Sequence, residues 1–184
     1  MFANHRTQSD EELMRLVQQG DERALAELYD RYSTKLVRYF HRMLWKDEEK
    51  AQDFLHDLFL KLIEQPQRFD AERIFTTWLY SSAFNMCKNE YRRQSFRNGQ
   101  SLDHDKIVFQ PDADLQDFQR TLDASLREVD EADRNLFVLR YELDLPLAEI
   151  GKIMDCPEGT VKSRIFYLKK KLTRCLRDFN PAIQ

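Results

Sequence analysis

The stretch that decides the fold lies near the end of the chain, where residues 147–164 read LAEIGKIMDCPEGTVKSR. Pro146 stands directly before it and favours the start of a short helix, which we expect to reach about Met154. The next four residues, 155–158, have the composition of a tight turn. Gly151 supplies the small residue that the crossing of a second helix requires. The stretch therefore predicts two helices joined by a tight turn, a helix-turn-helix.

The second helix of this pair, expected over residues 159–178, should bury Val161 and Ile165 one turn apart. Near its start, polar side chains face outward, where a recognition helix meets base edges and phosphates: Thr160, Lys162, Ser163 and Arg164. Positive charge continues along the same helix through Lys169, Lys170, Lys171, Arg174 and Arg177. A charge run alone more often marks a solvated face, but together with the preceding helix and turn it indicates DNA binding.

Upstream of this pair the chain also reads as helices. Helix breakers are rare, since only 4 Gly and 5 Pro occur among 184 residues. A capping box at residues 9–12 and N-cap residues Asp21, Asp47 and Asp130 mark four helix starts. Behind each start, apolar residues recur at spacings of three and four. The first of these helices ends near residue 20, the third ends at Pro66, and others run over about 74–96, 117–129 and 131–143.

Residues 98–116 lack this periodicity and carry turn and acidic residues. We therefore expect an all-α protein of two small helical domains, residues 1–97 and 117–184, joined by a flexible acidic linker. Residues 1–98 carry 16 Lys/Arg and 16 Asp/Glu, residues 99–150 carry five and 13, and residues 151–184 carry eight and three. The net charge of −3 thus conceals a basic C-terminal end, where the motif predicts DNA binding.

Composition also excludes several classes of protein. No apolar run approaches the ~20 residues of a membrane-spanning helix, and no signal peptide precedes the first helix. Three scattered cysteines, Cys87, Cys156 and Cys175, favour a reducing, cytoplasmic setting. The chain lacks a Gly-rich phosphate loop, a nucleophile elbow and ligand-spaced His and Cys residues. We expect no catalysis, metal, cofactor, small-molecule substrate or membrane insertion.

Residues 134–177 resemble the C-terminal domain of extracytoplasmic-function (ECF) sigma factors of bacterial RNA polymerase. The resemblance rests on Leu139-Arg140, Glu149-Ile150 and the uninterrupted run GTVKSR over 159–164. It implies that the helix-turn-helix reads the minus-thirty-five promoter element through Thr160, Lys162, Ser163, Arg164, Tyr167 and Lys170. Tyr167 stands where the family often has Arg, so it cannot make the bidentate guanine contact and the promoter preference should differ.

Residues 51–62, AQDFLHDLFLKL, resemble the polymerase-binding helix of the same family. The resemblance implies that the polar face of this helix docks on the largest subunit of the polymerase, through Gln52, Asp53, His56, Asp57 and Lys61. Periodicity alone would equally suit an ordinary solvated face in front of a core.

Residues 75–80, FTTWLY, and the bases, aromatics and amides that follow resemble the family's minus-ten region. Such a mixture suits a single DNA strand, because rings stack on bases and cations hold phosphates. The resemblance implies contacts from Asn85, Lys88, Asn89, Tyr91, Arg92 and Arg93, with Asn85 holding an extruded base. Trp78 is expected in the core, while Ser81 and Phe84 stand where many members have Arg.

The chain is thus identified as a member of the ECF sigma factors. The family implies RNA polymerase core enzyme and promoter DNA as partners, an anti-sigma factor as regulator of a stress or envelope regulon, and a monomer when free. The alternative is a stand-alone helix-turn-helix regulator, but residues 1–98 show no dimerisation or effector module. We further hypothesise that acidic residues around the linker screen the basic last helix: Asp103, Asp105, Asp112, Asp114 and Asp117.

Overall fold

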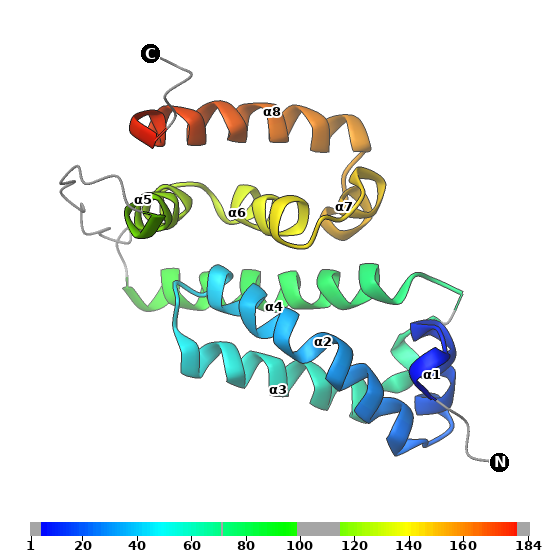
Figure 1. Cartoon of the computed structure of the whole chain (residues 1–184). Helices are drawn as coiled ribbons and strands as arrows, with labels where there is room; N and C mark the ends of the chain where they lie inside the picture. Colours follow the sequence, from blue (N-terminus) through cyan, green and yellow to red (C-terminus); the bar gives the residue numbers. More distant parts are fainter. Residues whose placement is uncertain (1–4, 71, 99–114, 180–184) are drawn as a thin grey trace. The chain divides into compact units, whose positions relative to one another are not determined.

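The computed structural model describes residues 5–70, 72–98 and 115–179 (Figure 1). Within these ranges the α-helices number eight and no strand occurs, which confirms the predicted all-α fold. The chain forms two compact units, Met1–Glu90 and Tyr91–Gln184. The division falls inside the fourth helix, whereas the sequence placed the end of the first domain at residue 97. Most of the predicted linker, residues 99–114, lies outside the described residues.

The first unit is built on four helices: α1 (Asp10–Gln18), α2 (Glu22–Met43), α3 (Glu48–Glu64) and α4 (Phe75–Asn98). Their predicted N-caps are confirmed. Ser9 Oγ accepts from the Glu12 amide at 3.2 Å, and the Glu12 carboxylate accepts from the Ser9 amide at 2.9 Å. Asp21 and Asp47 likewise accept hydrogen bonds from first-turn amides of α2 and α3. Local capping chemistry therefore sets where these helices begin.

Helices α2 and α3 lie side by side and carry most of the core of this unit (Figure 1). Edge-on aromatic pairs join α4 to α2, Tyr32 with Phe75 and Tyr39 with Tyr80, each at 5.4 Å between ring centroids. Trp78, expected in the core, is partly buried against Phe69. These rings fix which face of α4 turns inward, and therefore which face it presents outward.

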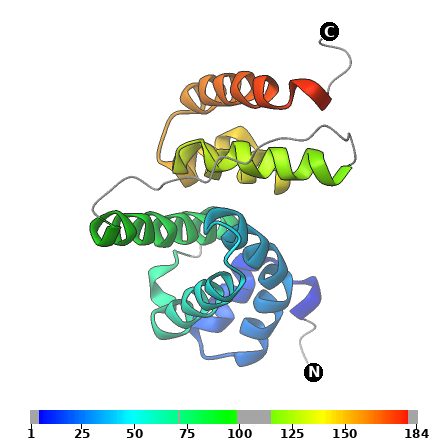
Figure 2. The same cartoon turned by 90° about the vertical axis from the view of Figure 1, so that its left-hand side faces the viewer.

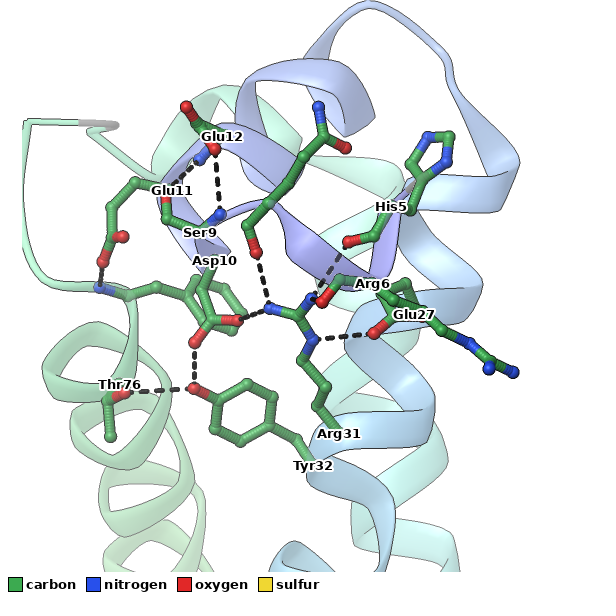
Figure 3. Close-up of polar contacts among 12 residues, drawn as sticks. His5, Arg6, Ser9, Asp10, Glu11, Glu12, Glu27, Arg31, Tyr32 and Thr76 are labelled. Atoms are coloured by element: carbon green, nitrogen blue, oxygen red, sulfur yellow. Dashed lines mark hydrogen bonds and ion pairs between the residues drawn. The ribbon is translucent and has the colours of Figure 1, made fainter. Parts of the chain in front are cut away.

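A polar cluster ties the start of the chain to α2 (Figure 3). Arg31 on α2 donates to the carboxylates of Asp10 at 2.7 Å and Glu27 at 2.8 Å. Its guanidinium also donates to three backbone oxygens of the N-terminal segment, those of His5, Arg6 and Gln8. Four of these five hydrogen bonds hold the N-terminal residues against α2, and the fifth, to Glu27, lies within α2.

The same cluster reaches the start of α4 (Figure 3). The Tyr32 hydroxyl donates to Asp10 and lies 3.1 Å from Thr76 Oγ1, and burial raises the pKa of Tyr32 above its ordinary value. The Glu11 carboxylate accepts from the Phe75 amide at 2.9 Å, so α1 satisfies a first-turn amide of α4. The orientation of α4 is therefore fixed from both α1 and α2.

The second unit comprises α5 (Leu115–Arg127), α6 (Glu131–Phe137), α7 (Leu147–Met154) and α8 (Glu158–Cys175). Helix α8 packs on α5, α6 and α7, as Figure 2 shows. A short 3₁₀ turn, Arg177–Phe179, follows α8, so the last helix ends earlier than the predicted residue 178.

The predicted helix over residues 131–143 is not uniform. Asp130 caps α6 as predicted, but residues Val138–Glu142 form a π-helical turn, in which the Leu143 amide bonds back to Val138 at 3.0 Å. Arg134 is 2% exposed and donates to the carbonyls of Leu126 and Val129 at the end of α5, and its burial lowers the pKa of the guanidinium. A buried cation in place of water thus satisfies the last turn of α5.

Candidate functional site

All five predicted polymerase-facing side chains lie exposed on α3, opposite its buried stripe: Gln52, Asp53, His56, Asp57 and Lys61. Two apolar side chains lie among them, Leu60 at 51% and Ile63 at 50% exposed. Ile63 continues the apolar spacing of this helix, yet it lies outside the buried stripe that runs from Ala51 to Leu62. The face is therefore polar along most of its length and partly apolar toward the C-terminal end of α3, a composition that suits a protein-binding surface.

Helix α4 presents a second exposed face. Asn85, Asn89 and Arg92 follow one another at spacings of four and three, and all three are exposed, as is Arg93. Tyr91 and Lys88 are partly buried at the sides of this face. The structure thus brings the predicted minus-ten residues onto one helix, with Asn85, Asn89 and Arg92 in line.

Two contacts hold charged side chains of α4, those of Lys88 and Glu90. Phe84, which stands where the family often has Arg, is buried, and the Lys88 ammonium lies 4.8 Å from the centre of its ring. Glu90, the one acidic residue of α4, pairs with Lys50 of α3 at 2.6 Å. The cation–π contact orients Lys88, and the ion pair neutralises the only carboxylate of the helix.

The helix-turn-helix is formed by α7 and α8, as the sequence predicted. Asp155 closes α7 in the left-handed conformation at φ 53°, which Asp tolerates better than most residues. A Cβ at Gly151 would lie 2.7 Å from the carbonyl oxygen of Cys156 and 3.8 Å from Val161. Gly151 is therefore required at the crossing, because the turn backbone occupies the space of any side chain there.

The outer face of α8 exposes five of the six predicted minus-thirty-five residues, Thr160, Lys162, Ser163, Tyr167 and Lys170. Val161 is buried and Ile165 partly buried on the opposite side. Phe166, which the sequence reasoning missed, is 64% exposed beside Tyr167 at 67%, with ring centroids 5.5 Å apart. An exposed Phe on a basic helix is the signal that could have found it.

The sixth residue, Arg164, is partly buried and turned toward α6. Its guanidinium lies 3.3 Å from Asp133 and 3.8 Å from Asp130, and neither contact has hydrogen-bond geometry. Burial, and then the neighbouring Asp130, raises the pKa of Asp133 above its ordinary value, while Arg164 acts in the opposite direction. Lys162 pairs with Glu158 one turn earlier at 2.8 Å. Two of the predicted DNA-facing cations therefore have carboxylate partners.

An apolar groove of about 440 Å³ opens between α5, the π turn and α8. Phe118, Leu122, Phe137, Tyr141, Leu172 and Leu176 contribute to its lining. Because these residues come from separate segments, spacing along the sequence gave no sign of the groove.

No helix of the described residues is long and apolar enough to cross a membrane. Nor do His, Cys, Asp and Glu gather in threes that could hold a metal ion within those ranges.

Comparison with known families matches both units. Residues 28–97 match the family model of sigma-70 region 2, and residues 119–172 match that of sigma-70 region 4. The RNA polymerase sigma-H factor of Pseudomonas aeruginosa is 31% identical, over 92% of this chain and 95% of its own length. The ECF RNA polymerase sigma factor SigW of Bacillus subtilis is 30% identical, over 88% and 94%. The chain belongs to the ECF RNA polymerase sigma factors.

This ECF sigma factor is accordingly an RNA polymerase-binding initiation factor, and the stand-alone regulator is not favoured. Its fold is that of CnrH, solved in complex with the cytosolic domain of CnrY, at a TM-score of 0.72, 22% identity and coverage of 93% and 99%. The sigma factor RpoE of Bartonella quintana, solved with the anti-sigma factor NepR, matches at a TM-score of 0.63, 20% identity and coverage of 82% and 97%. At these identities the two structures show the fold alone.

Proposed function

We propose that three helix faces divide the work of initiation. The exposed face of α3 docks on the polymerase core, the Asn85–Asn89–Arg92 face of α4 captures the minus-ten strand, and the outer face of α8 reads the minus-thirty-five element. The observation that carries this proposal is that each set inferred from the sequence lies together on one helix. None of the 17 residues in these sets is buried, and only Arg164 turns inward to an ion pair.

The chemistry of each face supports its assignment. On α3, carboxylates and an amide offer hydrogen bonds, and Leu60 and Ile63 farther along the helix offer apolar contact. On α4, amides and cations without a free carboxylate suit a single strand, since amides can bond base edges and cations can bind phosphates. On α8, Ser163 and Lys162 stand at the start of a helix that a helix-turn-helix places in a major groove.

Pull-down of core enzyme tests the α3 assignment. The double variant Asp53→Ala/His56→Ala should lose most of its core binding, because both side chains are exposed and nothing in the core depends on them. Asp30→Ala, an exposed acidic residue on α2, is the matched control and should bind as the parent does. Equal binding by the double variant would contradict the assignment.

Runoff transcription tests the function as a whole. Promoter-dependent transcripts should form only when both this protein and core enzyme are present. Tight binding of duplex promoter DNA by the protein alone, with no response to core enzyme, would instead support the stand-alone regulator.

We also propose a regulatory partner, a cellular location and an oligomeric state for this protein. Two sigma factors of the same fold were solved with CnrY and the anti-sigma factor NepR, which supports an anti-sigma factor as a partner of this chain too. As an initiation factor that must meet RNA polymerase, the protein would act in the cytoplasm, as a monomer before binding and without catalysing a reaction. Co-purification from cells with an anti-sigma factor would test the first point, and sedimentation of the purified protein would test the monomer.

A further inference from the structure

Phe96 lies near the C-terminal end of α4 and is 88% exposed, more than any other large hydrophobic side chain of the described residues. Its exposure leaves a large apolar ring available for contact with a partner. Nothing in the packing of the described residues covers it. Its neighbours on the helix indicate what that partner is.

Helical spacing places Phe96 in line with the residues proposed to hold the minus-ten strand. Asn85, Asn89, Arg92 and Phe96 follow one another at intervals of four, three and four, which is one stripe of an α-helix. All four are exposed, and α4 is continuous from Phe75 to Asn98. Their alignment therefore follows from the geometry of one helix.

The charge around this stripe is of one sign. Lys88 flanks it near the middle and Arg93 near its end, while Arg92 lies within it. Neither arginine forms an ion pair in the ranges that the structure describes. The only carboxylate of α4, that of Glu90, is 12% exposed and held by Lys50. A face with free cations, two amides and an aromatic ring complements a polyanion that carries bases, rather than an acidic or apolar protein surface alone.

We propose that Phe96 is a base-stacking residue that extends the minus-ten site along the single strand beyond Asn85. The inference rests on the proposed role of α4 in binding that strand. Eleven residues of helix separate the two side chains by about 16 Å, roughly the length of five stacked nucleotides of one strand. Asn85 then selects one base through its edge, while Phe96 stacks on another without reading its identity.

Binding of a forked promoter DNA with a single-stranded minus-ten tail to reconstituted holoenzyme tests this inference. Phe96→Ala should weaken binding about fivefold or more, the loss that follows from one base–aromatic stack. Phe96→Trp should bind within about twofold of the parent, since its ring also stacks. Ser95→Ala, the exposed neighbour outside the stripe, is the matched control. Because Phe96 is 88% exposed among the described residues, none of these changes should alter thermal stability.

An abasic scan along the tail separates stacking from any other role. One abasic position, within about six nucleotides of the Asn85 base, should weaken the parent and leave Phe96→Ala unchanged. Loss of Asn85→Ala binding with normal Phe96→Ala binding would overturn the stacking role while leaving α4 as the minus-ten helix. Normal binding by both variants would overturn the proposed site itself. Loss of core-enzyme binding by Phe96→Ala, with DNA binding unchanged, would make Phe96 a protein contact and also overturn the inference.

Discussion

The two helices that we propose to face DNA, α4 and α8, differ in how their cations are held. On α4, Arg92 and Arg93 are exposed without an ion pair in the described ranges, and the helix's only carboxylate is tied to α3. On α8, Lys162 pairs with Glu158, and Arg164 lies against Asp133 and Asp130. Both helices are basic, but the cations near the start of α8 have carboxylate partners, whereas Lys169, Lys170 and Arg174 farther along it have no ion pair in the described ranges.

This difference predicts how strongly each helix face should bind DNA phosphates. A phosphate that approaches α4 meets cations that have only water and counterions to release. A phosphate that approaches Lys162 or Arg164 of α8 must compete with carboxylates already in place, so part of the electrostatic gain is lost there. Duplex binding by α8 alone should therefore be weak, and attachment of the protein to polymerase would supply the local concentration that it lacks.

The largest effect should come from disrupting the packing of α8 against α7. Gly151→Val places side-chain atoms on the Cys156 carbonyl oxygen, 2.7 Å from the built Cβ position, and should destabilise the second unit by about 1–3 kcal/mol. Minus-thirty-five binding should fall with it, while binding of a minus-ten single strand persists. Gly159→Ala meets no atom within 4 Å and is the matched control in thermal unfolding. Equal losses for both glycines would refute the crossing constraint.

Removing the bonds that Arg31 makes to the N-terminal residues should have the next largest effect. Arg31→Met deletes five hydrogen bonds around Asp10, Glu27 and the N-terminal backbone and should lower the free energy of unfolding by about 1–2 kcal/mol. Chemical denaturation measures this loss. Arg38→Met, on the exposed side of α2, should stay within about 0.5 kcal/mol of the parent. A neutral Arg31→Met would mean that the Arg31 bonds in Figure 3 do not stabilise the first unit.

Measuring stability as a function of pH tests the contact between Asp133 and Arg164 of α8. Because the pKa of Asp133 is raised, the folded unit binds this proton more tightly than the unfolded chain does. The stability that it contributes is present below the ordinary value of 3.8 and is lost as pH rises through the raised pKa. Asp133→Asn should flatten this part of the stability curve and strengthen duplex binding a few-fold by releasing Arg164. Asp144→Asn, at an exposed carboxylate, should change neither.

The smallest effect on DNA binding should come from breaking the exposed ion pair between Glu158 and Lys162. Glu158→Gln frees Lys162 and should raise duplex affinity by up to about fivefold at low salt, the limit set by a surface ion pair. The gain should shrink as salt rises, because screening weakens both the pair and the phosphate contact. Glu142→Gln makes the same change of charge on the π turn and serves as the control in fluorescence anisotropy. No gain from Glu158→Gln would show that its carboxylate does not compete with DNA.

Local signals predicted most of the fold because capping and periodicity are local chemistry. Ser9, Asp21, Asp47 and Asp130 each cap the helix that follows, as expected. The helix-turn-helix was predictable because the crossing of its two helices has one demanding position, Gly151 of α7. The π turn at Val138–Glu142 was not, since α and π turns share the same apolar pattern over so few residues.

The sites were predictable only as sets of residues on a face. Ile63 has the spacing of a core residue, and only packing against α2 shows that the core is complete without it. The partners of Arg164 come from α6, about thirty positions earlier, and no spacing rule joins them. The groove beside α8 and the exposure of Phe96 and Phe166 likewise depend on tertiary packing. The roles assigned to these residues remain predictions.

The most direct test of the account is promoter melting by holoenzyme that carries Asn85→Ala. Permanganate reactivity of unpaired thymines in the minus-ten element measures melting, and core pull-down of the same protein controls for docking. The account predicts that reactivity on duplex promoter falls about tenfold or more, because extruding a base costs a few kcal/mol that Asn85 helps to offset. Core binding should not change, and a promoter with a pre-opened mismatch should recover most of the activity. Melting equal to that of the parent protein would contradict the claim that the α4 face captures the minus-ten strand.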